Sequence, residues 1–438
     1  MTVPPFVGDG VSVLTCSVRR AYRDAQRALA RQPPTRALVA VPRTARFMGE
    51  TALRKLRDPV PGMPVPDVTP MFAAHVAMDE VILALVMGPN RFPRRADYER
   101  VSAELRSARR LFEAEGWLDD PRSYHREPPP LDEPAVSRGW ALGQSYERLL
   151  FASGWQPRPE EPGADRWATY EHNRTSVATV LRHRDRPRPW VVGVHGFAMG
   201  SPFMDFVGVH ALRLHRELGL NVVLPVLPLH GARKINRLSG EAFLGFDLIN
   251  TVHGLTQAVW DVRRVLTWIE TQGPADIAMY GVSLGGYVTA LVAGIDQRLA
   301  CAIAGIPVVD FPGLISAHSP MHLRMRAIEH EIIDGNADIV HRVISPLAYE
   351  PAVPVDRRFI FAGLGDRLAR PSQAYRLWLH WERPSTCWYA GNHVGYLWST
   401  QVTDFIVRAL SSSGFDGRGP ATASNHRRSA PSEPAPPG

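Results

Sequence analysis

The spacing of apolar residues divides the chain into two parts with different predicted structures. Up to about residue 150, apolar residues recur every three or four positions, which is the period of a helix with one buried face. The helices expected from this spacing are 19–31, 36–56, 71–87, 97–115 and 141–152, with a charged, proline-rich linker over 118–136. Residues 1–155 are therefore predicted to form a helical N-terminal extension.

One of these expected helices, 71–87, is almost wholly apolar. Thr69 and Pro70 precede it, and a threonine cap followed by proline is a typical helix start. His75, Asp79 and Glu80 lie in its middle, and the segment is too short to span a membrane. We expect a buried helix, packed on the rest of the chain or on a partner, and no integral membrane segment.

From about residue 165 onward, apolar residues come in short continuous runs, as in strands that are buried on both faces. The strands expected are one within 166–182 and others at 190–194, 221–224, 276–280, 299–306, 358–362 and 386–389. The helices expected between and after them are 206–217, 246–272, 287–295, 372–381 and 395–410. This alternation predicts an α/β domain over 165–411, with a mostly parallel sheet and helices on both faces. Residues 412–438 are expected to form a disordered tail.

The composition of the chain argues against several classes of function and of site. The net charge of +7 comes almost entirely from arginine, a bias typical of a GC-rich genome. The arginines are scattered among acidic residues, whereas a nucleic-acid-binding face needs them clustered. The three cysteines lie far apart and lack metal-ligand spacing, so we expect neither a disulfide framework nor a metal site. With no evident signal peptide, a reducing cytoplasmic setting is expected.

Candidate chemistry centres on Ser283. The sequence Gly281-Val-Ser283-Leu-Gly285 follows an apolar run and precedes a helical segment. A serine at a tight strand-to-helix turn is the arrangement that exposes a nucleophile, and the glycines leave room for neighbouring backbone. On this pentapeptide alone, a glycine-rich turn with an incidental serine is equally compatible.

Other motifs supply potential partners for Ser283. His195-Gly196-Phe197 follows the run at 190–194, and a proline-rich His-Gly turn ends at Gly231. Two later strand-like runs end in Asp366 and His393, which gives the chain order serine, acid, histidine. With these motifs, residues from about 165 to 411 resemble the α/β-hydrolase family.

The resemblance implies an α/β-hydrolase fold and specific catalytic roles. Ser283 would be the nucleophile, His393 the base, and Asp366 the acid that orients the histidine. The backbone N–H groups of Phe197 and Leu284 would form the oxyanion hole. No cofactor and no metal ion are required by this chemistry.

Several assignments keep an alternative. Asp310, after the run at 299–306, is the other candidate for the acid, and His195 is expected to be structural. The segment 311–344 is too long for a single crossover helix and is predicted to be a cap over the pocket. A crossover helix with a long loop is the alternative.

The expected function is a serine hydrolase that cleaves a small-molecule carboxylic ester or thioester through an acyl-enzyme. One alternative is a peptidase resembling the prolyl oligopeptidases, but these carry a β-propeller, and residues 1–155 lack repeated short strands. A second alternative is a non-catalytic hydrolase-like scaffold. Loss of a triad member would be the usual sign of a scaffold, and all three are present.

Overall fold

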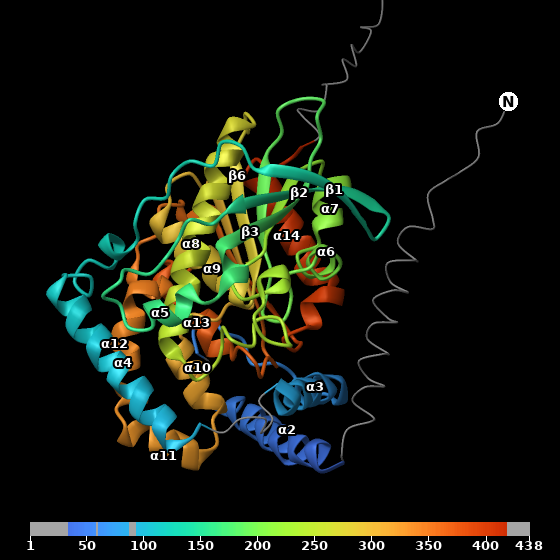
Figure 1. The fold of residues 1–438 in the computed structure, drawn as a ribbon. Coiled ribbons are helices and arrows are strands. Elements are labelled where there is room, and N and C mark those ends of the chain that lie inside the picture. Colours follow the sequence, from blue (N-terminus) through green and yellow to red (C-terminus); the bar gives the residue numbers. More distant parts are fainter. Residues whose placement is uncertain (1–33, 58–59, 87–92, 418–438) are drawn as a thin grey trace, which may run out of the picture.

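The computed structural model describes residues 34–57, 60–86 and 93–417 (Figure 1). Its centre is a sheet built from strands β1 (Ala135–Ala141), β2 (Gln144–Ala152), β3 (Thr175–Leu181), β4 (Trp190–Val194), β5 (Asn221–Pro225), β6 (Ile277–Val282), β7 (Cys301–Gly305), β8 (Arg358–Gly363) and β9 (Ser385–Tyr389). The strand order is β1-β2-β3-β5-β4-β6-β7-β8-β9. Strands β4 to β9 pair in parallel, whereas β3 is antiparallel to both β2 and β5.

Helices cover both faces of this sheet. One face carries α8 (Leu248–Thr271), α9 (Leu284–Ile295) and α13 (Pro371–His380), and the other carries α6 (Pro202–Gly208), α7 (Ala211–Arg216) and α14 (Thr400–Ser412). Strand β4 shows how the sequence supports this arrangement. Trp190 and Val192 point into the cluster of the first face, and Val191 points into that of the second. A parallel strand packed on both sides must be apolar at every position, and β4 is.

The predicted strands from 190 to 389 are confirmed as β4 to β9. Within 166–182 the strand is shorter than the expected segment, because α5 (Ala164–Ala168) precedes β3. The helix expected at 206–217 is split into α6 and α7, since His210 adopts a left-handed backbone with φ of 52°. A left-handed residue cannot continue a right-handed helix.

The predicted helix at 141–152 is wrong. This segment is strand β2, which forms a hairpin with β1 and extends the sheet beyond β3. The two residues of the turn, Leu142 and Gly143, both have positive φ, at 47° and 71°, as a tight two-residue hairpin requires. Leu149 and Phe151 alternate with more exposed residues and enter the core, which is the period of a strand. The sheet therefore begins at residue 135.

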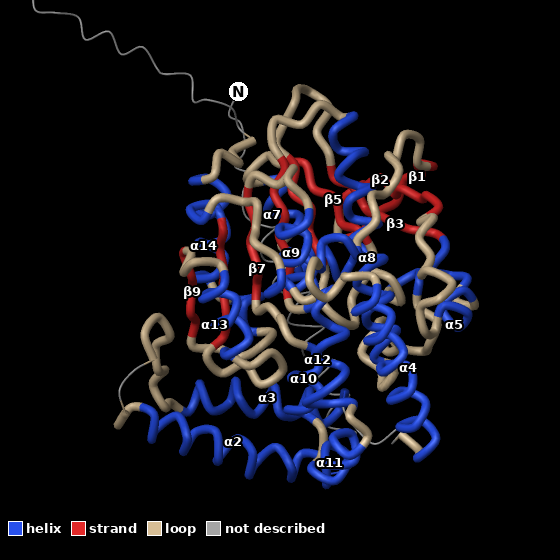
Figure 2. Tube along the Cα trace, turned by 90° about the vertical axis from the view of Figure 1, so that its left-hand side faces the viewer, coloured by secondary structure: helices blue, strands red, loops and turns tan. Residues whose placement is uncertain are grey.

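The other helices predicted in the N-terminal region are confirmed within a few residues, except 19–31, which lies outside the described residues. They are α2 (Pro34–Arg54), α3 (Pro70–Val86) and α4 (Arg95–Ala114). Helices α2 and α3 lie side by side beyond one end of the sheet (Figures 1 and 2). Their shared cluster joins Phe47, Phe72 and Val76 to Leu364, just after β8. Across the described ranges, no helix is both long and apolar enough to cross a membrane.

The segment 311–344 consists of successive short helices, including α10 (Phe311–His318), α11 (Met321–Glu329) and α12 (Ala337–Val340). Its first half is partly exposed, with Met321 at 69% exposure, whereas Ile332 and Ile344 in its second half are fully buried. The second half therefore belongs to the packed core, and a role of the segment as a cap stays a prediction. Of the predicted tail, residues from 418 onward lie outside the described residues, and Phe415 is buried.

The turn between β6 and α9 depends on two glycines. A Cβ atom on Gly281 would lie 2.1 Å from the carbonyl oxygen of Gly285. A Cβ atom on Gly285 would lie 2.0 Å from the carbonyl oxygen of Val194 in β4. Strand, sharp turn and helix thus pack at backbone distance, with Ser283 at the apex. The sheet order, the helices on both faces and this turn together make the α/β-hydrolase fold that the motifs predicted.

Replacement of Gly285 by alanine should destabilise the protein strongly. The added methyl group meets backbone atoms of β4 that cannot move aside, so we expect a loss of about 3 kcal/mol or more in the free energy of unfolding. The matched control is Gly49→Ala in α2, where a Cβ atom meets nothing within 4 Å. That change should stabilise the helix by about 0.5–1 kcal/mol. Urea denaturation measures both, and an unchanged midpoint for Gly285→Ala would contradict the packing argument.

Candidate active site

Ser283 is held in a strained conformation at the start of α9. Its backbone has φ of 57° and ψ of −114°, which costs a non-glycine residue about 1–3 kcal/mol. Its N–H donates to the carbonyl of Gly305 at 2.8 Å, at the end of the neighbouring strand β7. The residue stays partly exposed. The fold therefore fixes the backbone of this residue without burying the residue completely.

The structure brings the predicted serine, histidine and acid into one hydrogen-bonded chain. His393 Nε2 lies 3.0 Å from Ser283 Oγ, and His393 Nδ1 lies 2.6 Å from Asp366 Oδ2. The other oxygen of Asp366 accepts the backbone N–H groups of Leu368 and Ala369, each at 2.8 Å. These bonds fix the carboxylate so that one oxygen faces the imidazole. The aspartate follows β8 and the histidine follows β9, at the same edge of the sheet as the serine.

The competing acid, Asp310, has other partners. It caps α10 by accepting the N–H of Gly313 at 2.9 Å, and it forms an ion pair with Arg376 at 2.6 Å. Its carboxylate is therefore committed to a helix terminus and an arginine rather than to His393. This geometry favours Asp366 over Asp310 as the histidine's partner.

His195 holds the loop after β4 in place. Leu227 N–H donates to its Nε2 at 3.0 Å, so its proton resides on Nδ1, which donates to the carbonyl of Gly196 at 2.8 Å. Both ring nitrogens are thus used within the protein, in line with a structural role.

The two predicted oxyanion donors lie on elements that flank Ser283. Leu284 is the first residue of α9, and the first N–H groups of a helix have no acceptor inside it. Phe197 follows Gly196, at which a Cβ atom would lie 3.5 Å from the Cβ of Ser283. The loop carrying Phe197 therefore passes against the serine. The role of both N–H groups stays a prediction.

Comparison with known proteins identifies relatives of this chain. It is 41% identical over 354 residues to "Uncharacterized protein Rv2627c" of Mycobacterium tuberculosis strain H37Rv, an alignment that covers 80% of this chain and 85% of the relative. "Uncharacterized protein MT2702" of strain CDC 1551 matches equally, with 41% identity over the same length. The chain belongs to the Rv2627c family. No protein-family model matches it.

Similarity to solved structures is weaker than similarity to the Rv2627c family. An acetyl xylan esterase from Paenibacillus sp. R4 aligns with a TM-score of 0.47 and 13% identity, over 75% of this chain and 98% of that one. Acetyl xylan esterase 1 from Thermoanaerobacterium sp. JW/SL YS485 aligns with a TM-score of 0.44 and 10% identity, over 68% and 93%. TM-scores below 0.5 do not carry an assignment of function.

In this member of the Rv2627c family, helix α3 contributes residues to the surroundings of the site that the sequence reasoning missed. Asp79 is fully buried and accepts the backbone N–H groups of His393 and Arg367, both at 2.9 Å. Glu80, also buried, pairs with the Arg367 side chain at 2.8 Å. His75 Nδ1 lies 3.1 Å from Asn392 Oδ1. The available signal was the presence of three polar residues inside an otherwise apolar helix.

The pKa of His393 reflects a competition between burial and charge. Burial lowers it, but the charge of Asp366, the hydrogen bond to Asp366 and the charge of Asp79 outweigh burial. The pKa of His393 therefore lies above its ordinary value of 6.5. Burial, and next repulsion from Asp366, raise the pKa of Asp79 from 3.8 to about 7. Both carboxyl groups therefore interact electrostatically with the imidazole of His393.

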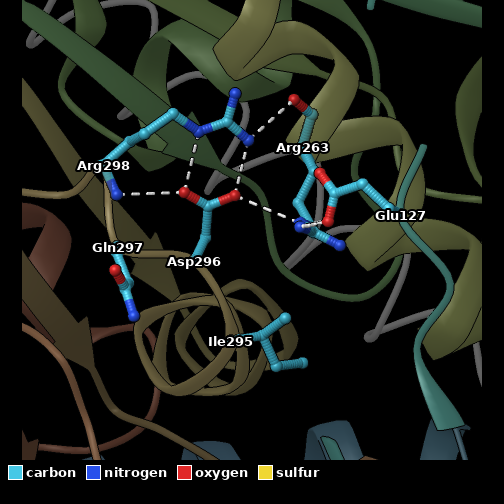
Figure 3. A pocket seen from close by; sticks show the side chains of 6 residues that line it. All are labelled: Glu127, Arg263, Ile295, Asp296, Gln297 and Arg298. Carbon is cyan, nitrogen blue, oxygen red and sulfur yellow. Dashed lines mark hydrogen bonds and ion pairs between the residues drawn. The ribbon is translucent and has the colours of Figure 1, made fainter. Parts of the chain in front are cut away.

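A hollow of about 290 Å³ lies on another part of the surface (Figure 3). It is lined by Glu127, Arg263, Ile295, Asp296, Gln297 and Arg298. Asp296 pairs with Arg263 at 3.1 Å and with Arg298 at 2.5 Å, so the charges of the hollow neutralise one another. Ile295 ends helix α9, which Ser283 directly precedes, and a helix of this length separates its ends by roughly 18 Å. The hollow therefore lies away from the triad. Within the described part of the chain, no group of His, Cys, Asp and Glu side chains has the arrangement of a metal site.

NMR titration of the histidine rings can check the charge balance at His393. Its ring should titrate above 6.5, because its protonated form is stabilised by Asp366, and Asp366→Asn should lower that pKa. His393→Gln assigns the resonance. His230, whose pKa burial lowers to about 3, serves as the internal control and should stay neutral across the range. A His393 pKa at or below 6.5 would contradict the attraction that we describe.

Proposed function

We propose that this protein is a serine hydrolase that cleaves a small-molecule carboxylic ester or thioester through an acyl-enzyme. The observation that carries the proposal is the hydrogen-bonded chain from Ser283 through His393 to Asp366. A serine hydroxyl holds its proton at neutral pH, so it becomes a useful nucleophile only beside a base that is itself oriented. The strained serine at a strand-to-helix turn supports the same reading.

In the proposed acylation, Ser283 Oγ attacks the carbonyl carbon of the substrate while its proton moves to His393 Nε2. The tetrahedral oxyanion accepts hydrogen bonds from the N–H groups of Phe197 and Leu284, each worth about 10²–10³ in rate. When the bond to the leaving group breaks, His393 returns the proton to the departing oxygen or sulfur. The serine is left as an acyl ester.

Deacylation repeats these steps with water as the nucleophile. His393 takes a proton from the water as its oxygen attacks the acyl carbon, and then returns a proton to Ser283 Oγ as the acid departs. Asp366 stays ionised throughout, since its role is to hold the proton of His393 on Nδ1 and to stabilise the imidazolium. The chemistry needs neither a metal ion nor an organic cofactor.

The setting of the site supports a small substrate in a reducing compartment. Ser283 is partly exposed, as access of a small-molecule carbonyl to its hydroxyl requires. Cys301 and Cys387 are buried free thiols, which is the usual state in the cytoplasm. We place the protein there, and the proposal includes a cap over the pocket formed by the segment 311–344.

A fluorophosphonate probe tests the nucleophile. The wild type should be labelled covalently, whereas Ser283→Ala should not be, because the hydroxyl that attacks phosphorus is gone. Hydrolysis of p-nitrophenyl acetate should fall by about 10⁴-fold or more in the same variant. The control is Ser102→Ala, a buried serine of α4 whose hydroxyl donates to the carbonyl of His330. Equal labelling of wild type and Ser283→Ala would show that another serine reacts, and no labelling of the folded wild type would favour the scaffold.

Paired asparagine variants test the acid. Asp366→Asn should lower kcat by about 10³–10⁴-fold, because an amide in this position no longer fixes the productive tautomer of His393. Asp310→Asn should retain most of the activity, since its carboxylate serves Arg376 and the cap of α10. Steady-state kinetics on folded protein distinguishes them. If only the Asp310 change abolished turnover, the assignment of Asp366 would be wrong.

A further inference from the structure

The carboxylate of Asp79 joins the two loops that carry the base and the acid. A single oxygen, Oδ2, accepts the N–H of His393 and the N–H of Arg367, the residue that follows Asp366, each at 2.9 Å. The other oxygen, Oδ1, accepts from the side-chain amide of Asn392 at 3.0 Å. One side chain of helix α3 therefore binds the backbone of His393 and the backbone of the residue that follows Asp366.

Neighbouring residues of α3 and α2 reinforce this contact. His75, one turn before Asp79, meets the other end of the Asn392 amide. Glu80 binds the Arg367 side chain at 2.8 Å and lies 3.6 Å from Arg43 of α2. The Arg367 guanidinium in turn lies over the ring of Phe47, 4.5 Å from its centroid. Helices α2 and α3 thus hold the loop that carries Asp366 through both the backbone and the side chain of Arg367.

We propose that Asp79 is a positioning residue for the catalytic histidine and acid, so that the N-terminal helices complete the active site. This inference rests on the hydrolase function proposed above. The loops that carry Asp366 and His393 leave different strands, and their relative position decides whether the imidazole reaches both Ser283 and Asp366. Displacements of about 1 Å at such a site cost about 10²-fold in rate. Asp79 holds the two loops at one atom, and the hydrogen bonds that it accepts come from these loops rather than from the serine.

The charged and titratable groups around this contact are few and identifiable. Asp366 and His393 face Asp79 from the catalytic loops, Tyr389 faces it from β9, and Arg367 contributes its backbone N–H. Glu80 points to the guanidinium of Arg367 instead. The bonds that Asp79 accepts come from two backbone N–H groups and an amide, and none of these can be satisfied by an aliphatic side chain.

The test compares two replacements of Asp79 in the full-length protein. Asp79→Ala removes the acceptor for all three N–H groups, and we expect kcat for p-nitrophenyl acetate to fall by about 100-fold with KM changed less than about 3-fold. Asp79→Asn keeps an oxygen in the Oδ2 position, and rotation of the Asn392 amide can present its oxygen to the new NH₂ group. This conservative variant should retain at least roughly one tenth of wild-type kcat.

Two controls separate positioning from loss of stability. Asp296→Ala removes another buried carboxylate that accepts a backbone N–H, at the far end of α9, and should leave kcat within about 2-fold of wild type. Thermal denaturation of every variant establishes that the assays report folded protein. If Asp79→Ala is folded and retains wild-type kcat, or if Asp79→Asn loses as much activity as Asp79→Ala, the positioning role is overturned.

A spectroscopic readout keeps the inference testable without turnover. The proton between His393 Nδ1 and Asp366 should give a far-downfield ¹H NMR signal, assigned by its loss in His393→Gln. We expect this signal to persist in Asp79→Asn and Asp296→Ala and to be lost in Asp79→Ala. Its persistence in Asp79→Ala would overturn the role of Asp79. A failure of fluorophosphonate labelling would instead reject the hydrolase function. The NMR signal would still test whether Asp79 positions His393 and Asp366.

Discussion

The shared direction of β6, β8 and β9 is the constraint on which the site depends. Parallel strands present their carboxyl ends at one edge of a sheet, so the residues that follow them become neighbours however far apart they are in the chain. Ser283 and His393 are separated by 110 positions, yet their side chains meet at 3.0 Å. The parallel pairing of β7 with β6 and β8 sets the spacing between these strand ends. Any change that shifts this register would separate the three side chains.

Several features of the site are energetically unfavourable, and the packing around the site must compensate for their cost. Ser283 carries backbone strain, and two carboxyl groups that contact His393, those of Asp79 and Asp366, are almost fully buried. Isolated buried charges are costly, so each must be hydrogen-bonded. Asp366 obtains two N–H groups from its own loop, whereas Asp79 obtains its donors from two loops far away in sequence. The packed core around the site must offset the cost of the strained serine and of the two buried carboxyl groups.

The sequence predicted the parallel strands well because each is a continuous apolar run bounded by turn residues, as in 190–194. It also singled out Ser283, Asp366 and His393, which follow such runs in a recognisable order and which the structure brings together; their catalytic roles stay a prediction. It failed at 141–152, where the apolar residues fit a helix or a strand and the deciding partner is β3, a contact that local pattern does not contain. The contacts of Asp79 were missed for the same reason. A polar residue inside an apolar helix signals a buried partner without saying which one.

Helix α3 also shows why the N-terminal region should not be regarded as a separable extension of a complete α/β domain. A helix with a buried aspartate and a buried glutamate can pack only against a surface that offers hydrogen-bond donors to both carboxylates. The loops after β8 and β9 supply such donors. Conversely, without α3 the backbone N–H groups of Arg367 and His393 would lose their shared acceptor. Docking of the helix and ordering of the loops that carry Asp366 and His393 are therefore coupled, since each satisfies the buried polar groups of the other.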